Sequence, residues 1–307
     1  MKLIHGFDDP EAYRGGYVAI GNFDGVHRAH QQMVSTLVDL ARNDGVPAVV
    51  LTFSPHPMQL LNPDKAPPSL STLKRKTGLL GACGVDCVIA YPTDRTLLNL
   101  TPGEFFERII QRELEARGLV EGPNFCFGRN RSGTVETLQS LCSAGGLHLR
   151  IVPAVTIGEQ LVSSSAVREL ISRGDIMDAV ELLGHPYRIQ GRVVKGASRG
   201  ASIGFPTANL DEVKTLLPAD GVYAGVVHWA GRKYAAAVNL GPNPTFGDAT
   251  RKLEVHLLDF TGDLYGKDLE VDFLVRIRDT KTFEDADALR VQLVHDVEQV
   301  RACADVV

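Results

Sequence analysis

The chain has 307 residues, of which 44% are hydrophobic and 22% charged, and its formal net charge is −5. This length favours two domains, and the composition is typical of a globular protein rather than a disordered one. The acidic balance argues against a general nucleic-acid binder, which usually carries a basic excess. No apolar run approaches the roughly 18 residues of a membrane helix, and residues 1–16 lack the apolar centre of a signal peptide. The five cysteines, an odd number, fit reduced thiols. We therefore expect a cytoplasmic protein that binds neither nucleic acid nor membrane; the sequence leaves its oligomeric state open, a homo-oligomer included.

The first half of the chain alternates strand and helix signals. Short apolar runs predict strands at Tyr17–Gly21, Ala48–Phe53, Asp86–Tyr91 and His148–Val152. Helical spacing of apolar residues predicts helices at Gln31–Arg42, Ser71–Ala82, Pro102–Ala116, Val135–Ala144, Ser164–Ser172 and Ile176–Leu183. Alternation of helices with wholly apolar strands predicts an α/β domain whose parallel sheet is covered on both faces.

The pattern changes after Gly184, where strands follow one another without intervening helices. They are expected at Arg188–Val194, Gly221–Trp229, Lys233–Leu240, Leu253–Phe260 and Leu269–Ile277. Glycine, proline and asparagine turns join them, which predicts an antiparallel sandwich or barrel. A long helix over Thr282–Cys303, opened by a Thr282-x-x-Asp285 capping box, is expected to close this half. The predicted domains are therefore 1–183 and 184–307.

The segment Gly21–His30 reads GNFDGVHRAH and lies where a strand ends and a helix begins. The N-terminus of a helix offers free N–H groups and the positive end of its dipole, which suits phosphate. His27 and His30 are three residues apart and share one helix face, from which they can donate hydrogen bonds to a phosphoryl group. The alternative is a capping aspartate with two surface histidines. The pair behind a glycine-rich strand end favours the phosphate site.

Three more segments of the first half combine polar groups with strand or helix ends. The Pro55-His56-Pro57 segment follows the second strand, and the alternative is a rigid loop. The Gly122–Gly133 segment contains Asn124, Gly128 and Arg131 and could hold a nucleotide, whereas alone it is only a surface loop. The Ser163–Arg168 segment places hydroxyl groups and a cation at a helix start, where an N-cap serine is common. No GxxxxGK[ST] phosphate loop is present.

In the second half, the Gly191–Asn209 segment is rich in glycine and carries the cations Lys195 and Arg199. Glycines at 196, 200 and 204 would let backbone N–H groups face a phosphate chain. Thr207 and Asn209 lie two residues apart, so in an extended segment both point the same way and offer oxygens that suit Mg²⁺. The alternative is a glycine-rich hairpin. Strand alternation places Glu254 on the other face of its strand from the apolar Leu253, Val255 and Leu257. By itself this indicates a solvent-facing residue.

The first half resembles the HxGH nucleotidyltransferases, and in particular the prokaryotic FAD synthetase module. Its GNFDGVH, PHP, NFxFGxxRxG and SSxxxR segments occur in that order between about residues 16 and 183. The resemblance implies a Rossmann-like domain, a flavin contact at Pro55, His56 and Pro57, and an ATP site at Gly21, Asn22, Phe23, Asp24, His27, His30, Asn124, Gly128, Arg131, Ser163, Ser164, Ser165 and Arg168. Ala29 stands where that family usually has glycine, which either narrows the nucleotide pocket or is tolerated at the helix start.

The second half resembles riboflavin kinase through its GFPTAN, LEVHLLDF and DLYG segments. The resemblance implies that Glu254 is a catalytic base, that Mg²⁺ binds Thr207 and Asn209, and that Arg278 lies on the flavin side. It also implies an ATP site at Lys195, Gly196, Arg199, Gly200, Gly204, Pro206, Thr207 and Asn209.

As a whole, the sequence resembles the bacterial bifunctional riboflavin kinase/FAD synthetases. The resemblance implies two reactions: riboflavin and ATP give FMN, and FMN and ATP give FAD and pyrophosphate. His27, His30 and Arg168 would stabilise charge in the second reaction. Two alternatives stay open, which are a kinase with an inactive adenylyltransferase half, suggested by Ala29, and a flavin-binding regulator without turnover.

Overall fold

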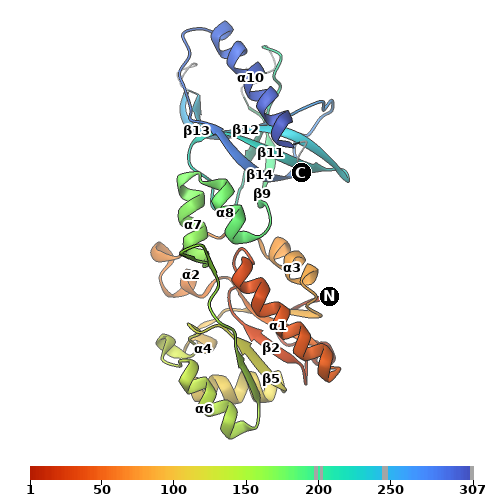
Figure 1. The fold of residues 1–307 in the computed structure, drawn as a ribbon, viewed down its shortest axis with the longest axis vertical. Coiled ribbons are helices and arrows are strands. Elements are labelled where there is room, and N and C mark those ends of the chain that lie inside the picture. Colours follow the sequence, from red (N-terminus) through yellow and green to blue (C-terminus); the bar gives the residue numbers. More distant parts are fainter. Residues whose placement is uncertain (197–199, 201–202, 244–247, 305–307) are drawn as a thin grey trace. The chain divides into compact units, whose positions relative to one another are not determined.

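The computed structural model describes residues 1–196, 200, 203–243 and 248–304 (Figure 1). The chain packs into two compact units, one of residues 1–68 and 72–162, the other of residues 69–71 and 163–307. None of the helices in these described ranges is long and apolar enough to cross a membrane. The domain boundary expected between residues 183 and 184 is a statement about which segment folds and is active on its own. It stays a prediction.

The first unit contains a six-stranded sheet in the order β1-β4-β3-β2-β5-β6, with every pair parallel, as predicted. Its strands are β1 (Lys2–His5), β2 (Tyr17–Ile20), β3 (Ala48–Ser54), β4 (Cys87–Pro92), β5 (Gly118–Glu121) and β6 (His148–Ile151). The sequence analysis missed β1 and β5. Strand β1 lies at an edge and buries one residue, Ile4, and β5 has only four residues, so neither gives a long apolar run.

Helices cover both faces of this sheet, which confirms the predicted layering. Met33, Val34 and Leu37 of α1 pack with one core cluster, and Phe105 and Ile110 belong to the other. The helices of the unit are α1 (Arg28–Asp44), α2 (Pro57–Leu61), α3 (Leu73–Ala82), α4 (Arg95–Leu98), α5 (Pro102–Phe105), the π-helical η3 (Phe106–Glu113) and α6 (Val135–Gly145), with 3₁₀ turns η1 (Pro10–Ala12), η2 (Pro63–Lys65) and η4 (Arg129–Arg131). The single helix expected at Pro102–Ala116 is thus two segments of different winding.

The strand order places a topological switch point between β2 and β5. From β2 the chain proceeds through β3 and β4 toward one edge of the sheet, whereas β5 and β6 lie on the other side. Doubly wound sheets bind ligands outside the carboxyl ends of the strands at such a point. The Gly21–His30 segment follows β2 and the Gly122–Gly133 segment follows β5. Two of the predicted motifs therefore begin at this position.

The second unit contains a closed antiparallel barrel, which was one of the two architectures predicted for this half. Its strand order is β10-β13-β12-β11-β14-β9. The strands are β9 (Tyr187–Val194), β10 (Ala208–Asp211), β11 (Gly221–Trp229), β12 (Arg232–Asn243), β13 (Asp248–Leu257) and β14 (Asp268–Arg278). The sequence analysis missed the four-residue β10. A short antiparallel hairpin of β7 (Thr156–Ile157) and β8 (Gln160–Leu161) precedes this unit in the chain and belongs to the first unit.

Among the described residues, α8 (Ile176–Leu183) and α10 (Ala286–Ala304) pack on the barrel, and α7 (Ser164–Arg173) packs against α8. Helix α8 contacts β9 and β14, and α10 contacts β11, β12 and β14. The prediction that the last helix begins at Thr282 is wrong. The helix begins at Ala286, because Asp285 Oδ1 accepts a hydrogen bond of 2.8 Å from Ala288 N and so caps it.

Candidate active sites

The Gly21–His30 segment joins the carboxyl end of β2 to the first turn of α1. His27 is the N-cap residue, and its carbonyl oxygen accepts a hydrogen bond of 3.0 Å from Gln31 N. His30 lies one turn inside the helix, and the two imidazole rings stack with centroids 3.7 Å apart. Asp24 and His27 are buried, at 6% and 5% exposure. The sequence prediction that both histidines share one face at a helix start is therefore met by the geometry.

Asn22 Oδ1 and His30 Nδ1 of this segment are buried polar atoms for which the described residues provide no hydrogen-bond partner. Buried polar atoms in folded proteins are nearly always hydrogen-bonded, so such atoms require an explanation. Burial, together with the charges of His27 and Lys76, lowers the pKa of His30 well below its usual 6.5. His30 is therefore neutral at pH 7 and can donate only one N–H. A ligand at this helix start that accepts from a His30 N–H and donates to Asn22 Oδ1 would satisfy both residues.

Ala29 lies inside α1, and its backbone is not among the positive-φ residues. The methyl group consequently has no conformational cost at this position.

The Gly122–Gly133 segment is a small hairpin after β5. Phe127 and Gly133 exchange two backbone hydrogen bonds of 3.0 and 2.9 Å, and the Phe127 ring is buried. Gly128 has φ 70°, and a Cβ there would come within 2.8 Å of Pro102 N, so a side chain does not fit. Asn124 and Arg131 are exposed on the hairpin. Both predicted polar groups are thus free of core packing.

The Pro55-His56-Pro57 segment connects β3 to α2. The Ser54–Pro55 peptide is cis, and His56 caps α2 by accepting a hydrogen bond of 3.1 Å from Met58 N at its Nδ1 atom. The segment thus lies at the carboxyl end of β3, as expected. Its flavin contact stays a prediction.

Ser163, Ser164, Ser165 and Arg168 belong to the second unit. Ser163 is the N-cap of α7, and its Oγ accepts a hydrogen bond of 3.2 Å from Ala166 N. The N-cap role, which was the alternative interpretation of this serine, is therefore present in the structure. The prediction that these residues bind the same nucleotide as His27 and His30 stays a prediction.

The glycine-rich loop before β10 is described at residues 195, 196, 200 and 203–207, and Arg199 lies outside the described residues. A Cβ at Gly196 would come within 2.1 Å of Asn209 Nδ2, and one at Gly200 within 2.3 Å of the Phe205 carbonyl oxygen. Gly204 has φ +92°. Gly196 and Gly200 are required by the loop itself, because the Asn209 amide and the Phe205 backbone occupy the space that side chains would need. At Gly204 the space is open, and the positive φ is what favours glycine. Lys195 is exposed.

Cross-strand register brings the predicted kinase residues together. Glu254 of β13 lies directly opposite Asn209 of β10 and, on its other side, opposite Asn239 of β12. Side chains opposite each other in an antiparallel pair share one face of the sheet. Leu253, Val255 and Leu257 are buried, as the alternation predicts, and Glu254 is half-buried on the other face. Sequence reasoning did not single out Asn239, because its proximity depends on the register of β12.

A pocket of about 170 Å³ lies on the face of β13 that carries Val255 and Leu257, away from Glu254. Pro206 and Thr207 line it, as do Phe260, Asp263 and Tyr265. His256, two residues after Glu254, holds the loop in place, because its Nδ1 atom lies 2.7 Å from the Pro206 carbonyl oxygen. Sequence reasoning missed this role of His256.

Arg278 is engaged within the barrel unit. Its guanidinium donates hydrogen bonds of 2.7, 2.9 and 3.1 Å to the carboxylate of Asp296, which is 1% exposed on α10. The guanidinium carbon Cζ of Arg278 also lies 5.8 Å from the centroid of the Phe283 ring. The structure thus gives Arg278 a part in holding α10, and its flavin contact stays a prediction.

The parallel-sheet unit has two histidines at the start of a helix, a position that suits phosphate. The barrel unit has a carboxylate opposite two asparagines. These features are those of a two-domain transferase of phosphorus-containing groups. Comparison with known proteins gives the same division: residues 9–166 match the FAD synthetase family and residues 183–304 match the riboflavin kinase family. The chain belongs to the family of bifunctional riboflavin kinase/FMN adenylyltransferases.

Relatives of that description cover nearly the whole chain. The protein from Escherichia coli K12 is 37% identical over 96% of both chains, and that from Pseudomonas fluorescens is 37% identical over 99% of this chain and 98% of its own. A crystal structure from Streptococcus pneumoniae, described as a macrolide-efflux protein, is 32% identical and superposes with a TM-score of 0.87 over 98% of this chain and 99% of its own.

Proposed function

We propose that the chain makes FAD in two ATP-dependent steps, with riboflavin phosphorylated in the barrel unit and FMN adenylylated in the parallel-sheet unit. The observation that carries this assignment is that each of the two family matches falls largely on one unit. A regulator that only binds flavin would not need a carboxylate in register with asparagines on both neighbouring strands.

In the kinase step, Glu254 takes the proton of the ribityl hydroxyl group. The hydroxyl oxygen then forms a bond to the γ-phosphorus of ATP, and the bond from that phosphorus to the bridging oxygen of ADP breaks. The half-burial of Glu254 beside Asn209 and Asn239 supports this role. The pocket that Pro206 and Thr207 line provides space for part of a nucleotide.

Thr207 and Asn209 are also the residues that we propose hold Mg²⁺. Their side-chain oxygens are the hard donors that this ion prefers, and Asn209 lies opposite a carboxylate. When bound with ATP, the ion neutralises phosphate charge.

In the adenylyltransferase step, the phosphate of FMN attacks the α-phosphorus of ATP and pyrophosphate leaves. The nucleophile is already an anion, so no proton needs to be removed from it. His27 and His30 contribute by alignment and by donating hydrogen bonds where charge moves. The free Nδ1 atom of His30 and the free Oδ1 atom of Asn22 support a ligand at this helix start.

Incubation of the full chain with riboflavin, ATP and Mg²⁺, followed by chromatography of the flavins, tests the two-step assignment. We expect FMN to appear first and FAD to accumulate. FMN without FAD would leave only the kinase, and neither product would indicate the flavin-binding regulator.

We predict that His27→Ala or His30→Ala lowers FAD formation from supplied FMN by about 10²–10³-fold, the usual cost of losing a donor to transition-state charge. FMN formation from riboflavin should stay near normal. His148→Ala is the matched control, because His148 is exposed and begins β6 at the opposite, amino-terminal edge of the sheet. A double variant of His27 and His30 with normal FAD output would remove the pair from the mechanism.

A further inference from the structure

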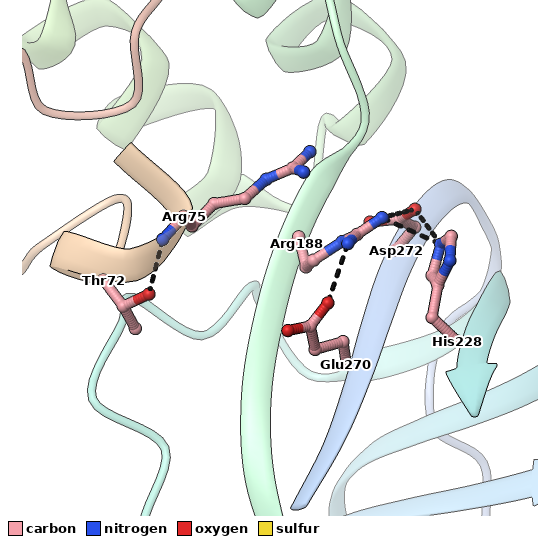
Figure 2. Close-up of polar contacts among 6 residues, drawn as sticks. All are labelled: Thr72, Arg75, Arg188, His228, Glu270 and Asp272. Atoms are coloured by element: carbon pink, nitrogen blue, oxygen red, sulfur yellow. Dashed lines mark hydrogen bonds and ion pairs between the residues drawn. The ribbon is translucent and has the colours of Figure 1, made fainter. Parts of the chain in front are cut away.

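Helix α3 carries a buried lysine, Lys76, whose side chain is directed at the segment after β2. Only 8% of Lys76 is exposed, whereas lysine is almost never buried without a partner. The start of α3 is fixed by Thr72, whose Oγ1 accepts a hydrogen bond of 3.2 Å from Arg75 N, drawn in Figure 2. The carbonyl oxygen of Thr72 also accepts one of 2.9 Å from Lys76 N. The helix therefore holds Lys76 at a defined place in its first turns.

The ammonium group of Lys76 has few protein contacts. Among the described residues its hydrogen-bond acceptor is Thr52 Oγ1 of β3, at the long distance of 3.4 Å. Thr52 Oγ1 in turn donates to the carbonyl oxygen of Asn22, 3.2 Å away. Burial lowers the pKa of Lys76, and the negative charge of Asp24 acts in the opposite direction. The charge of Lys76 is also one of the causes that lower the pKa of His30.

The hydrogen bond to Thr52, which itself donates to Asn22, places the ammonium group beside the Gly21–His30 segment. A buried ammonium ion with one long hydrogen bond is costly, because an ammonium group has three N–H donors to satisfy. The nearby free atoms, Asn22 Oδ1 and His30 Nδ1, are an independent sign that the cluster is incomplete without a ligand. A phosphate group would supply the missing acceptors for Lys76 and for a His30 N–H.

We propose that Lys76 is a catalytic residue of FMN adenylylation, whose ammonium group binds an oxygen of the ATP triphosphate beside His30. This proposal rests on the adenylyltransferase site proposed above. During the reaction the bond between the FMN phosphate oxygen and the α-phosphorus forms, and the bond from that phosphorus to pyrophosphate breaks. Lys76 keeps its proton throughout and stabilises the charge that moves onto the leaving pyrophosphate.

Lys76→Met tests the charge, because methionine keeps an unbranched apolar chain and removes the ammonium group. We expect kcat for FAD formation from supplied FMN to fall by about 10²–10³-fold. FMN formation from riboflavin in the same preparation should stay within about two-fold. The melting temperature should not fall, because replacing a poorly paired buried charge by an apolar group is often neutral or stabilising. Lys74→Met is the matched control, since Lys74 is exposed on the same helix.

Lys76→Arg separates charge from shape if the methionine variant is unstable. Arginine keeps a positive charge, so it should retain at least ten times the FAD-forming activity of the methionine variant. Equal losses in both variants, or a kcat and a KM for ATP within three-fold of wild type in Lys76→Met, would overturn the proposal. His27→Ala is measured alongside. If that variant loses FAD formation while Lys76→Met does not, the site stands and the role of Lys76 fails; if His27→Ala is also normal, the proposed site itself is wrong.

Discussion

Glu254 is the residue at which strand pattern and register give different expectations. Alternation along β13 puts it on the face away from the buried Leu253, Val255 and Leu257, which is the usual place of a solvated side chain. Register with β10 and β12 places it between Asn209 and Asn239 on that same face. The outer face of the barrel is therefore polar at this point because three strands bring hydrogen-bonding side chains together there.

We predict that Glu254→Gln lowers kinase turnover by about 10²–10⁴-fold, the usual contribution of a positioned general base. Binding of ATP and riboflavin should change only a few fold, because neither ground state requires the negative charge. The measurement is single-turnover phosphorylation of riboflavin, paired with adenylylation of FMN on the same preparation. Adenylylation should stay near normal, and so should both reactions of the exposed control Glu212→Gln.

Unchanged phosphorylation by Glu254→Gln would show that the residue is the bystander its strand pattern suggests. Loss of both reactions would instead indicate damage to the fold, which thermal unfolding of the variant would reveal.

At the scale of elements, an ion-pair cluster around the buried Asp272 connects three strands of the barrel, and its other members are partly buried. Arg188 of β9 donates hydrogen bonds of 2.6 and 2.7 Å to Asp272 of β14 and one of 2.8 Å to Glu270 of the same strand, as Figure 2 shows. His228 of β11 lies 2.7 Å from Asp272 Oδ2. Burial raises the pKa of Asp272, but the hydrogen bonds and charges of Arg188 and His228 outweigh it and lower the pKa below the usual 3.8.

We predict that Asp272→Asn lowers the free energy of unfolding at pH 7 by about 1–3 kcal/mol, because Arg188 loses a charged partner. Since the folded-state pKa of Asp272 lies below the unfolded value, its contribution is present above about pH 4 and is lost as the pH falls through the folded-state pKa. The difference between wild type and variant should therefore shrink in acid. Denaturant unfolding of both proteins across that pH range measures it.

Asp268→Asn is the matched control for this cluster. Asp268 begins β14 and pairs with Arg192 of β9, but both side chains are about half exposed, at 51% and 50%. Exposed pairs of this kind contribute about 0–1 kcal/mol. If Asp268→Asn lowered the free energy of unfolding as much as Asp272→Asn does, burial would not be the reason for the cluster's contribution to stability.

Which elements could be predicted follows from where their signals lie along the chain. The long apolar strands and α1 carry their own periodicity, and the HxxH spacing fixes two histidines on one helix face. Lys76 gave one weak signal, a lysine on the buried stripe with Thr77 and Leu80, but its contacts with Thr52 and Asp24 depend on how α3 packs. Register likewise decides that Asn239 faces Glu254, and a local sequence pattern contains no register.

At the scale of the whole molecule, the two helices α7 and α8 belong by packing to the barrel unit, although the sequence pattern groups them with the first half. Helix α8 buries Ile176, Ala179, Leu182 and Leu183. Gly174, between the two helices, has φ 84°, and a Cβ there would come within 2.8 Å of the Tyr223 hydroxyl oxygen of β11. The connection between α7 and α8 therefore lies against the barrel at a position where only glycine fits.

We predict that residues 184–307 fold alone and still make FMN, because the barrel is closed and α10 covers it without help from the first unit. A fragment of residues 163–307 should be more stable by about 2–5 kcal/mol, since α8 returns Ile176, Leu182 and Leu183 to burial at roughly 1.5–3 kcal/mol each, less the entropy cost of ordering the helix. Denaturant unfolding compares the fragments, and FMN formation from riboflavin measures their activity, with the full chain as reference. Equal stability would mean that α7 and α8 do not belong to the barrel unit in solution. A shorter fragment that is folded but makes no FMN would show that the kinase needs residues before 184, and that the predicted boundary is wrong.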